Sequence, residues 1–254
     1  MKLIIRADDV GYSEGVNYGI AKTVHDGLVR SVGVMPNMPA ARHGLDLLKG
    51  LDVCYGLHTN LCLGKPCADP AKVPSLLDEC GNLKSSRLYR EAWKRGEEIC
   101  VLDEMVLEIE AQYFRFIELT GRQPGYFEAH AVASKNLFQG LEIVAKKHGL
   151  RYNDLGFTGK PTCFNGKPII NMPMNEHDPN YDPAAWLKKC VLEALHGDSV
   201  PYVFISHPGY LDDYLIRTSS LTIPRAKEVA ALCNPEVKRW LAEQDIDLIT
   251  YDNL

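Results

Sequence analysis

Three hydrophobic runs of the chain end in side chains that can bind a metal ion. The first run ends in Asp8 and Asp9, the second in His58 and the third in His130. One carboxylate with two imidazoles is a recurrent ligand set for divalent cations, and a spare carboxylate beside it can act as a general base. A fourth run ends in His207, which adds another titratable group. The pattern is typical of a metal-dependent hydrolase.

Each of these signals also has a purely structural interpretation. Asp8 and Asp9 are compatible with a solvated turn in which one carboxylate caps the following helix. A histidine in an apolar strand, such as His58 or His130, is more often a hydrogen-bonded core residue than a ligand. Glu128 lies two residues before His130 on the same strand face, where it can accept a hydrogen bond that orients a ligand. The metal site is therefore predicted from the joint placement of these residues at strand ends.

The elements that must position these residues alternate between short β-branched or aromatic runs and longer segments with helical periodicity. The strand candidates are 2–7, 31–36, 53–58, 125–130, 150–154, 201–206 and 246–251. Such alternation predicts a parallel sheet, in which the carboxyl ends of the strands share one face. We therefore expect a single α/β domain over residues 1–254, built as an incomplete or irregular barrel of seven strands. A doubly wound open sheet is the alternative.

Capping residues mark the ends of several predicted helices. Ser13 is an expected N-cap for the helix after the first strand, and Gly149 is an expected C-cap. Two further helices are expected to begin at Pro183 and Pro235, since proline is favoured in the first helical turn. Gly96 predicts a break in a long, charged helical segment.

Two long stretches interrupt the alternation of strands and helices. Residues 62–86 and 156–182 are rich in glycine, proline, asparagine and lysine. Loops of this length in a compact domain are usually functional or disordered. Both follow strand ends on the proposed site face, so we expect them to form the walls of a substrate cleft. Within the second stretch, Asn165-Gly166 is a tight-turn signal for a small hairpin, and His177 is the one further histidine expected to touch substrate.

Composition and missing motifs argue against several classes of function. The net charge of −5 gives no reason to expect nucleic acid or an anionic membrane as a partner. The sequence has no glycine-rich phosphate motif and no Gly-x-Ser-x-Gly motif. Its eight cysteines form no Cys-x-x-Cys pair, and neither a signal peptide nor a membrane-spanning run is evident. We expect a cytoplasmic protein with reduced thiols that acts on a small molecule.

The motifs and their spacing resemble those of the YdjC-like carbohydrate deacetylases, which include chitooligosaccharide deacetylases. The matching motifs are Ala7-Asp8-Asp9-Val10-Gly11-Tyr12-Ser13, Gly56-Leu57-His58-Thr59-Asn60-Leu61, Glu128-Ala129-His130 and Ser206-His207-Pro208-Gly209. The loop 73–83 and the late motif Arg225-Ala226-Lys227-Glu228 are also similar to segments of that family. The resemblance extends over nearly the whole chain, and the set of motifs is far more specific than any one of them.

The resemblance implies a deformed (βα) TIM-like barrel with seven parallel strands, often a homodimer, that removes N-acetyl groups from an amino sugar or short chitooligosaccharide. By the same correspondence, a divalent ion, Mg²⁺ or Zn²⁺, would be held by Asp9, His58 and His130. Asp8 would be the general base and His207 the general acid, although the roles of Asp8 and Asp9 are interchangeable at this level. The residues expected to support the ligands or contact substrate are Glu128, Asn60, Arg225 and Glu228.

The chain departs from the family pattern near His130. Glu128 stands where the family usually has aspartate, and Val132 and Ser134 stand where it often has further histidines. Val10 replaces the more usual phenylalanine. These departures leave open a non-catalytic, metal-containing protein that binds a sugar. A metal-dependent sugar isomerase or an iron oxygenase is less favoured, since the former usually needs more carboxylates and a lysine, and the latter usually has an all-β fold.

Overall fold

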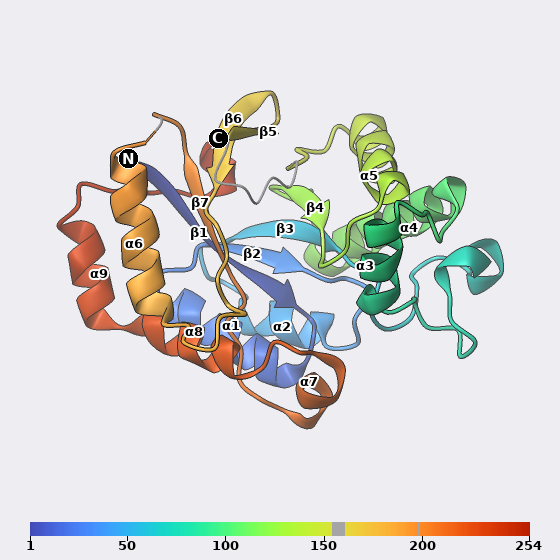
Figure 1. Cartoon of the computed structure of the whole chain (residues 1–254), viewed down its shortest axis with the longest axis horizontal. Coiled ribbons are helices and arrows are strands. Elements are labelled where there is room, and N and C mark those ends of the chain that lie inside the picture. Colours follow the sequence, from blue (N-terminus) through green and yellow to red (C-terminus); the bar gives the residue numbers. More distant parts are fainter. Residues whose placement is uncertain (154–160, 198) are drawn as a thin grey trace.

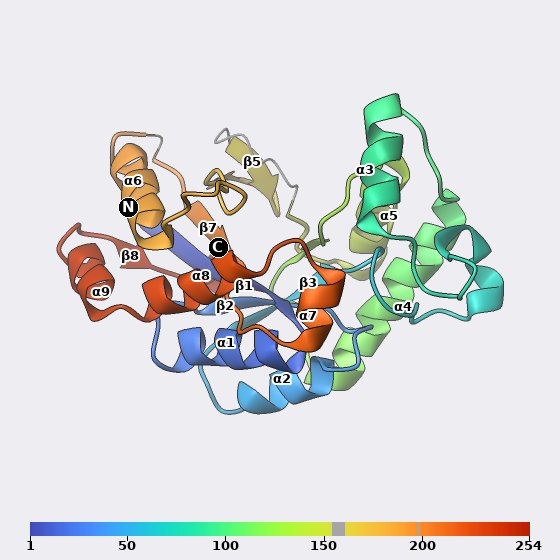
Figure 2. The same ribbon diagram turned by 60° about the horizontal axis from the view of Figure 1, so that its bottom comes forward.

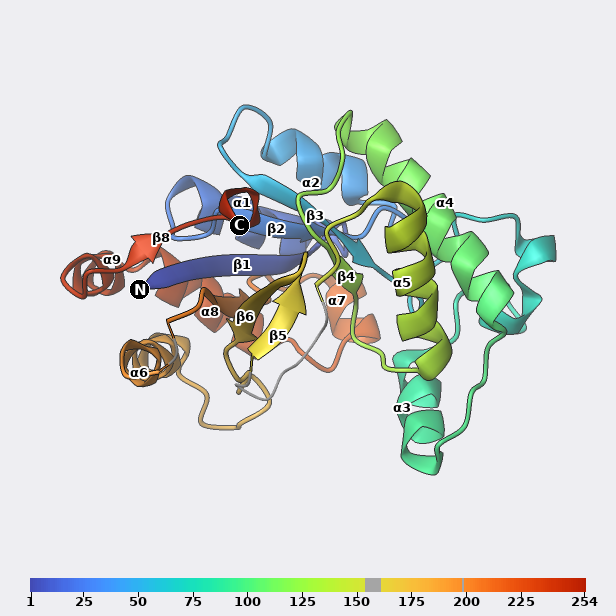
Figure 3. The ribbon, with the colours of Figure 1, turned by 90° about the horizontal axis from the view of Figure 1, so that it is seen from above.

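The centre of the fold is one curled sheet (Figure 1), seen in a computed structural model that describes residues 1–153, 161–197 and 199–254. Its strands are β1 (Lys2–Val10), β2 (Ser31–Val34), β3 (Cys54–Thr59), β4 (Phe127–Ala129), β5 (Pro161–Phe164), β6 (Lys167–Asn171), β7 (Tyr202–Ser206) and β8 (Asp247–Leu248). Seven of them follow one another in the order β4-β3-β2-β1-β7-β6-β5, and β8 pairs with the first residues of β1. The central strand β1 is buried from Leu3 onward. It pairs with β2 on one side and with β7 on the other, and Figure 3 shows it beside β2.

The predicted mostly parallel, barrel-like α/β fold is confirmed, with an addition at β5. The pairs along the path are parallel except β5 with β6, which is antiparallel. The sheet therefore has seven parallel strands, β1 to β4 and β6 to β8, and the antiparallel β5 is an additional strand in the stretch that was expected to be a loop with a small hairpin. The physical reason for its direction is the predicted turn, because Asn165 and Gly166 have φ of 49° and 77°, the left-handed backbone of the tight turns that join antiparallel strands.

The strand expected at 150–154 is reduced to two single bridges, and residue 154 lies outside the described residues. Tyr152 bridges to Phe127 of β4, and Asn153 bridges to Phe164 of β5. The N–H of Asn153 donates to the carbonyl oxygen of Phe127 at 2.9 Å. These two residues connect the ends of the curled sheet, which gives it the form of an irregular barrel.

Helices surround the sheet, and most of them cover its outside. They are α1 (Glu14–His25), α2 (Ala41–Leu47), α3 (Ser86–Arg95), α4 (Leu102–Thr120), α5 (Lys135–His148), α6 (Pro183–Leu195), α7 (Asp213–Thr218), α8 (Ile223–Cys233) and α9 (Pro235–Ala242). In space α6, α8, α1, α2, α4 and α5 contact one another in that order, and Figure 2 shows α1 and α2 beneath the sheet. None of the described helices combines the length and the apolar composition needed to cross a membrane.

The predicted helix ends are confirmed. Ser13 caps α1 by accepting a hydrogen bond from the N–H of Val16 at 3.2 Å. Gly96 and Gly149 end α3 and α5 in the left-handed conformation, as glycine permits. The prolines that begin α6 and α9 lie in the first turn of each helix.

The interior of the barrel changes from apolar to polar along the strands. Alternate residues of each strand face inward. From the base to the rim of the barrel, the inward-facing residues are Ile4, Arg6 and Asp8 on β1; Cys54 and His58 on β3; Tyr126, Glu128 and His130 at β4; and Val203, Ile205 and His207 at β7. The aromatic ring of Tyr251 stacks on Tyr126 at the base, with ring centroids 4.1 Å apart. The alternation thus brings one aspartate, one glutamate and three histidines to the carboxyl ends of the strands.

Candidate metal centre and cleft

The inward-facing rim residues form the floor of a deep cleft with a volume of about 780 Å³. The two long loops contribute to its walls as predicted, the first through Cys62, Leu63 and Ser86 and the second through Met174, Glu176 and His177. The part of the second loop at 156–160 lies outside the described residues. Such a cleft at the carboxyl ends of strands is the usual location of active sites in α/β barrels.

Asp8 and Asp9 both face the cleft because the end of β1 is irregular. In a regular strand adjacent side chains point to opposite faces, and only Asp8 would face inward. The pairing of β1 with β2 changes register between Ala7 and Val10, and Asp9 has φ of 80°. Opposite Asp8, β2 carries Gly33, where a Cβ atom would lie 2.5 Å from Asp8 Oδ1. The backbone is therefore shaped to place two carboxylates at one site.

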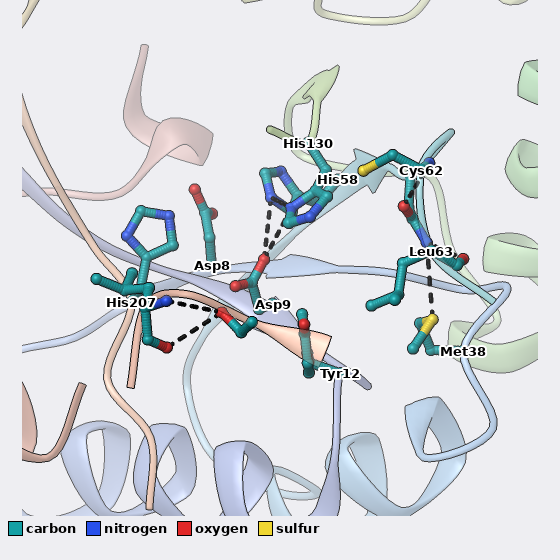
Figure 4. A network of polar contacts seen from close by, with 12 residues as sticks. Asp8, Asp9, Tyr12, Met38, His58, Cys62, Leu63, His130 and His207 are labelled. Atoms are coloured by element: carbon teal, nitrogen blue, oxygen red, sulfur yellow. Dashed lines mark hydrogen bonds and ion pairs between the residues drawn. The ribbon is translucent and has the colours of Figure 1, made fainter. Parts of the chain in front are cut away.

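Asp9, His58 and His130 converge on one point (Figure 4). Asp9 Oδ1 lies 3.3 Å from His58 Nε2 and 3.0 Å from His130 Nδ1, and these two ring nitrogens are 3.0 Å apart. All three residues are buried, and Asp9 Oδ1 has no hydrogen-bond partner among the described residues.

These separations fit the ligands of a metal ion. Ligand atoms about 2.0–2.1 Å from a tetrahedral or octahedral ion lie about 2.9–3.4 Å from one another. Burial opposes protonation of the two histidines, but the surrounding carboxylates outweigh it and raise the pKa of His58 to about 10 and that of His130 to about 9. The site therefore has a field that favours a cation, and its donor atoms suit either zinc or magnesium.

A second group, Asp8 with His58 and Glu128, also brings three donor atoms close together. Its negative charge is partly balanced by Arg6, whose Nη2 donates to Asp8 Oδ2 at 2.6 Å and to Glu128 Oε2 at 2.9 Å. Arg6 Nη1 also donates to the hydroxyl of Tyr251 at 3.2 Å. Arg6 thus bridges both carboxylates of this group, whereas the arginine next to Asp9, Arg225, contacts only the oxygen that faces away from the histidines. The group around Asp9 is therefore the better candidate for a metal.

Glu128 and Arg225 fix two of the candidate ligands. Glu128 Oε1 lies 2.5 Å from Nδ1 of His58, which turns the other ring nitrogen toward Asp9 and is the usual arrangement behind a metal-binding histidine. Arg225 donates from Nη2 to Asp9 Oδ2 at 2.7 Å. Burial would raise the pKa of Asp9, but His130 and Arg225 hold it well below its ordinary value. Asp9 is thus kept ionised, and Glu128 is held against His58 by a hydrogen bond.

His207 lines the cleft next to Asp8 and Asp9. Its backbone N–H donates to Glu228 Oε2 at 2.6 Å, and the other oxygen of Glu228 accepts from the hydroxyl of Tyr181 at 2.9 Å. Its ring Nδ1 has no hydrogen-bond partner among the described residues and lies 3.8 Å from Glu176 Oε1. Burial lowers the pKa of His207 below the ordinary value for histidine.

Asn60 and Ser134, two residues singled out in the sequence, lie outside the cleft lining. Asn60 does not line the cleft; its amide donates to Leu63 O at 2.7 Å and to Asn37 Oδ1 at 3.0 Å and so organises the loop after β3. Val132 lines the cleft, whereas Ser134 caps α5 by accepting from the N–H of Leu137.

Sequence reasoning missed several parts of the site. Arg6 is the most important of them. The sequence did indicate it, because Arg6 is a charged residue in an apolar strand and lies two residues before Asp8, on the same strand face. The cleft is also lined by a helix, α3, through Arg90, Trp93 and Lys94, and by residues 218–221, which are the end of α7 and the segment that follows it. No pattern in the sequence indicates that these two distant segments meet at the cleft.

Comparison with known proteins decides the family. The model of the family described as YdjC-like protein matches residues 2–243. The chain belongs to the YdjC-like family. Carbohydrate deacetylase 2 of Listeria innocua is 31% identical, with 100% of this chain and 99% of the relative covered. Chitooligosaccharide deacetylase of Escherichia fergusonii is 29% identical, with 98% of this chain and 97% of the relative covered.

The fold agrees with that of a solved structure. A crystal structure of an Enterococcus faecalis protein superposes with a TM-score of 0.84, covering 99% of this YdjC-like chain and 98% of its own at 24% identity. The resemblance inferred from the strand-end motifs is therefore confirmed, and so is the fold class. The names of the curated relatives are those of hydrolases, in agreement with the predicted enzyme class.

Proposed function

We propose that this chain is a metal-dependent hydrolase that removes the N-acetyl group from an amino sugar or a short chitooligosaccharide, releasing acetate and a free amine. The observation that carries the proposal is the convergence of Asp9, His58 and His130 on the cleft floor, with Asp8 and His207 beside them. The names of the curated relatives support the reaction and the class of substrate.

Asp9, His58 and His130 would hold one divalent ion, zinc or magnesium. When bound, such an ion polarises a carbonyl group and lowers the pKa of water toward neutrality. Glu128 keeps the ring of His58 in the ligating orientation, and Arg225 keeps Asp9 in place through the oxygen that does not face the histidines.

Asp8 is the proposed general base. Its Oδ2 is held by Arg6, whereas its Oδ1 is buried with no hydrogen-bond partner among the described residues and is free to accept a proton from water. Burial would raise the pKa of Asp8, but Arg6 and His58 lower it below its ordinary value. Asp8 is therefore ionised at neutral pH, as a base must be, and help of this kind is worth roughly 10²–10⁴ in rate.

His207 is the proposed acid that protonates the departing amine. Because burial lowers its pKa in the free protein, this role requires that negative charge developing in the cleft raise it again during the reaction. Glu176 lies 3.8 Å from the ring nitrogen and would favour the protonated form.

The test is acetate release from N,N′-diacetylchitobiose and a panel of other N-acetylated sugars. Metal-stripped protein is compared with protein given Zn²⁺, Mg²⁺, Mn²⁺, Co²⁺ or Ni²⁺. Metal-dependent acetate release is expected, and it would identify ion and sugar together. If the metal-loaded protein releases no acetate from any sugar, the result would favour a sugar-binding protein. Failure to bind any of the ions would refute the metal centre. A homodimer in the cytoplasm is also part of the proposal, and light scattering tests the dimer.

A further inference from the structure

The cleft extends beyond the metal centre along a wall that no proposed catalytic role uses. From His130 the chain continues through Ala131, Val132 and Ala133, which all line the cleft, to Phe138 in α5. The wall therefore begins at a candidate metal ligand and consists of small or apolar side chains.

Trp93 of α3 stands at the far end of this wall. Its ring lies edge-on to that of Phe138, with centroids 6.2 Å apart and an interplanar angle of 85°. Figures 1 and 3 both show α3 beside α5. Trp93 lines the cleft and is 47% exposed, although tryptophan is highly buried on average. An exposed indole in a cleft offers a flat apolar surface to a ligand.

The size of the cleft leaves room for more than the reacting sugar. Its volume of about 780 Å³ lies in the upper half of the range of about 300–1,000 Å³ that is typical of sites for drug-sized molecules. The apolar face of a pyranose ring packs on aromatic rings, while its hydroxyls need polar partners. Arg90, one turn before Trp93 on the same helix, also lines the cleft and supplies such donors.

We propose that Trp93 forms a binding site for the second sugar ring of the substrate, and that the enzyme therefore prefers a disaccharide or longer chain to a single amino sugar. This inference rests on the proposed function, because it places the ring that loses its acetyl group at the metal centre. The neighbouring ring would then lie along residues 131–133 and stack on the indole. Trp93 is a residue that determines chain-length specificity and takes no part in the chemistry.

The first experiment compares kcat/KM for N,N′-diacetylchitobiose with kcat/KM for N-acetylglucosamine in the metal-loaded enzyme. Trp93→Ala is expected to lower the ratio of the disaccharide kcat/KM to the monosaccharide kcat/KM about tenfold, because about this much is lost with one well-packed aromatic contact. Trp93→Phe should keep most of the native ratio, because phenylalanine retains an aromatic ring at this position. The matched control is Tyr18→Ala, since Tyr18 is 50% exposed and makes an edge-on contact with His43 but does not line the cleft. An unchanged ratio in Trp93→Ala would overturn the proposal.

The second experiment measures binding without turnover. Calorimetry with N,N′-diacetylchitobiose compares metal-loaded Asp8→Asn protein with the Asp8→Asn/Trp93→Ala double variant. Weaker binding to the double variant is expected. If binding depends on Trp93 while the native protein releases no acetate, the sugar site stands and the proposed reaction fails. Equal binding to the two proteins, or no binding to either, would overturn the site whatever the acetate assay shows.

Discussion

Replacing Glu128 by glutamine tests whether the charge behind His58 strengthens metal binding. The side chains have nearly the same shape, so an amide oxygen can still accept the hydrogen bond from His58 Nδ1 that Glu128 Oε1 makes at 2.5 Å. What is lost is the negative charge that makes the imidazole a better ligand. Arg6 keeps its other partners, Asp8 at 2.6 Å and the hydroxyl of Tyr251 at 3.2 Å. The geometry is retained and the electrostatics change.

We expect metal affinity to fall about 10- to 100-fold in Glu128→Gln, the usual loss when the partner of a ligating histidine is changed. This corresponds to about 1.4–2.8 kcal/mol of binding free energy. The amide nitrogen would face Arg6, so the free energy of unfolding should also fall, by about 1–3 kcal/mol. Calorimetric titration of metal-stripped protein with Zn²⁺ measures the affinity, and urea unfolding measures the stability.

The matched control is Glu108→Gln, another buried glutamate, which accepts from the backbone N–H of Cys67 at 3.0 Å and of Ala68 at 2.7 Å and does not line the cleft. This variant should lose stability but keep the metal affinity of the native protein. An unchanged affinity in Glu128→Gln, at one ion per chain, would refute the reasoning that the carboxylate acts on the metal through His58.

Three other changes test the remaining roles. His58→Ala should remove stoichiometric metal binding, and full metal content by elemental analysis would exclude His58 from the ligand set. Asp8→Asn should retain the metal but lower kcat at least about 100-fold, so an active variant would overturn its role as base. Burial raises the pKa of Glu228 to about 7 from an ordinary value of 4.5, so the stability linked to this group is present below about pH 4.5 and is lost as the pH rises to 7. Glu228→Gln should remove this part of the pH dependence, on the order of 3 kcal/mol between pH 4.5 and pH 8, and equal pH dependence of urea unfolding in both proteins would contradict it.

Elements governed by local rules were predictable from the sequence. The cap at Ser13, the helix end at Gly149 and the hairpin turn at Asn165 each depend on a few neighbouring residues, and each lies where it was expected. The strand expected at 150–154 was predicted less well. Its two bridging residues are held by partners in β4 and β5, and long-range pairing of this kind leaves no periodic signal.

The convergence of Asp9, His58 and His130 was also predictable, because parallel strands bring their carboxyl ends to one face. The inward turn of Asp9 was not, since it depends on a positive φ and a change of register in β1. Of the partners of the ligands, Glu128 was expected from its position on the strand face of His130, whereas Arg225 was assigned by resemblance. Arg6 was missed altogether, because a charge inside an apolar strand can be interpreted only once its buried partners are known.

Tyr251 supports the site from a position near the end of the chain, so it is synthesised after the residues that it supports. Every proposed ligand and catalytic residue is synthesised before it, and yet it stacks on Tyr126 at the base of the barrel and accepts a hydrogen bond from Arg6. A nascent chain can therefore contain all of its proposed chemistry while the barrel still lacks its floor and Arg6 lacks one partner. A chain that lacks Tyr251 would leave Tyr126 and its apolar neighbours at the base uncovered, and exposed apolar surface of this kind promotes aggregation during folding.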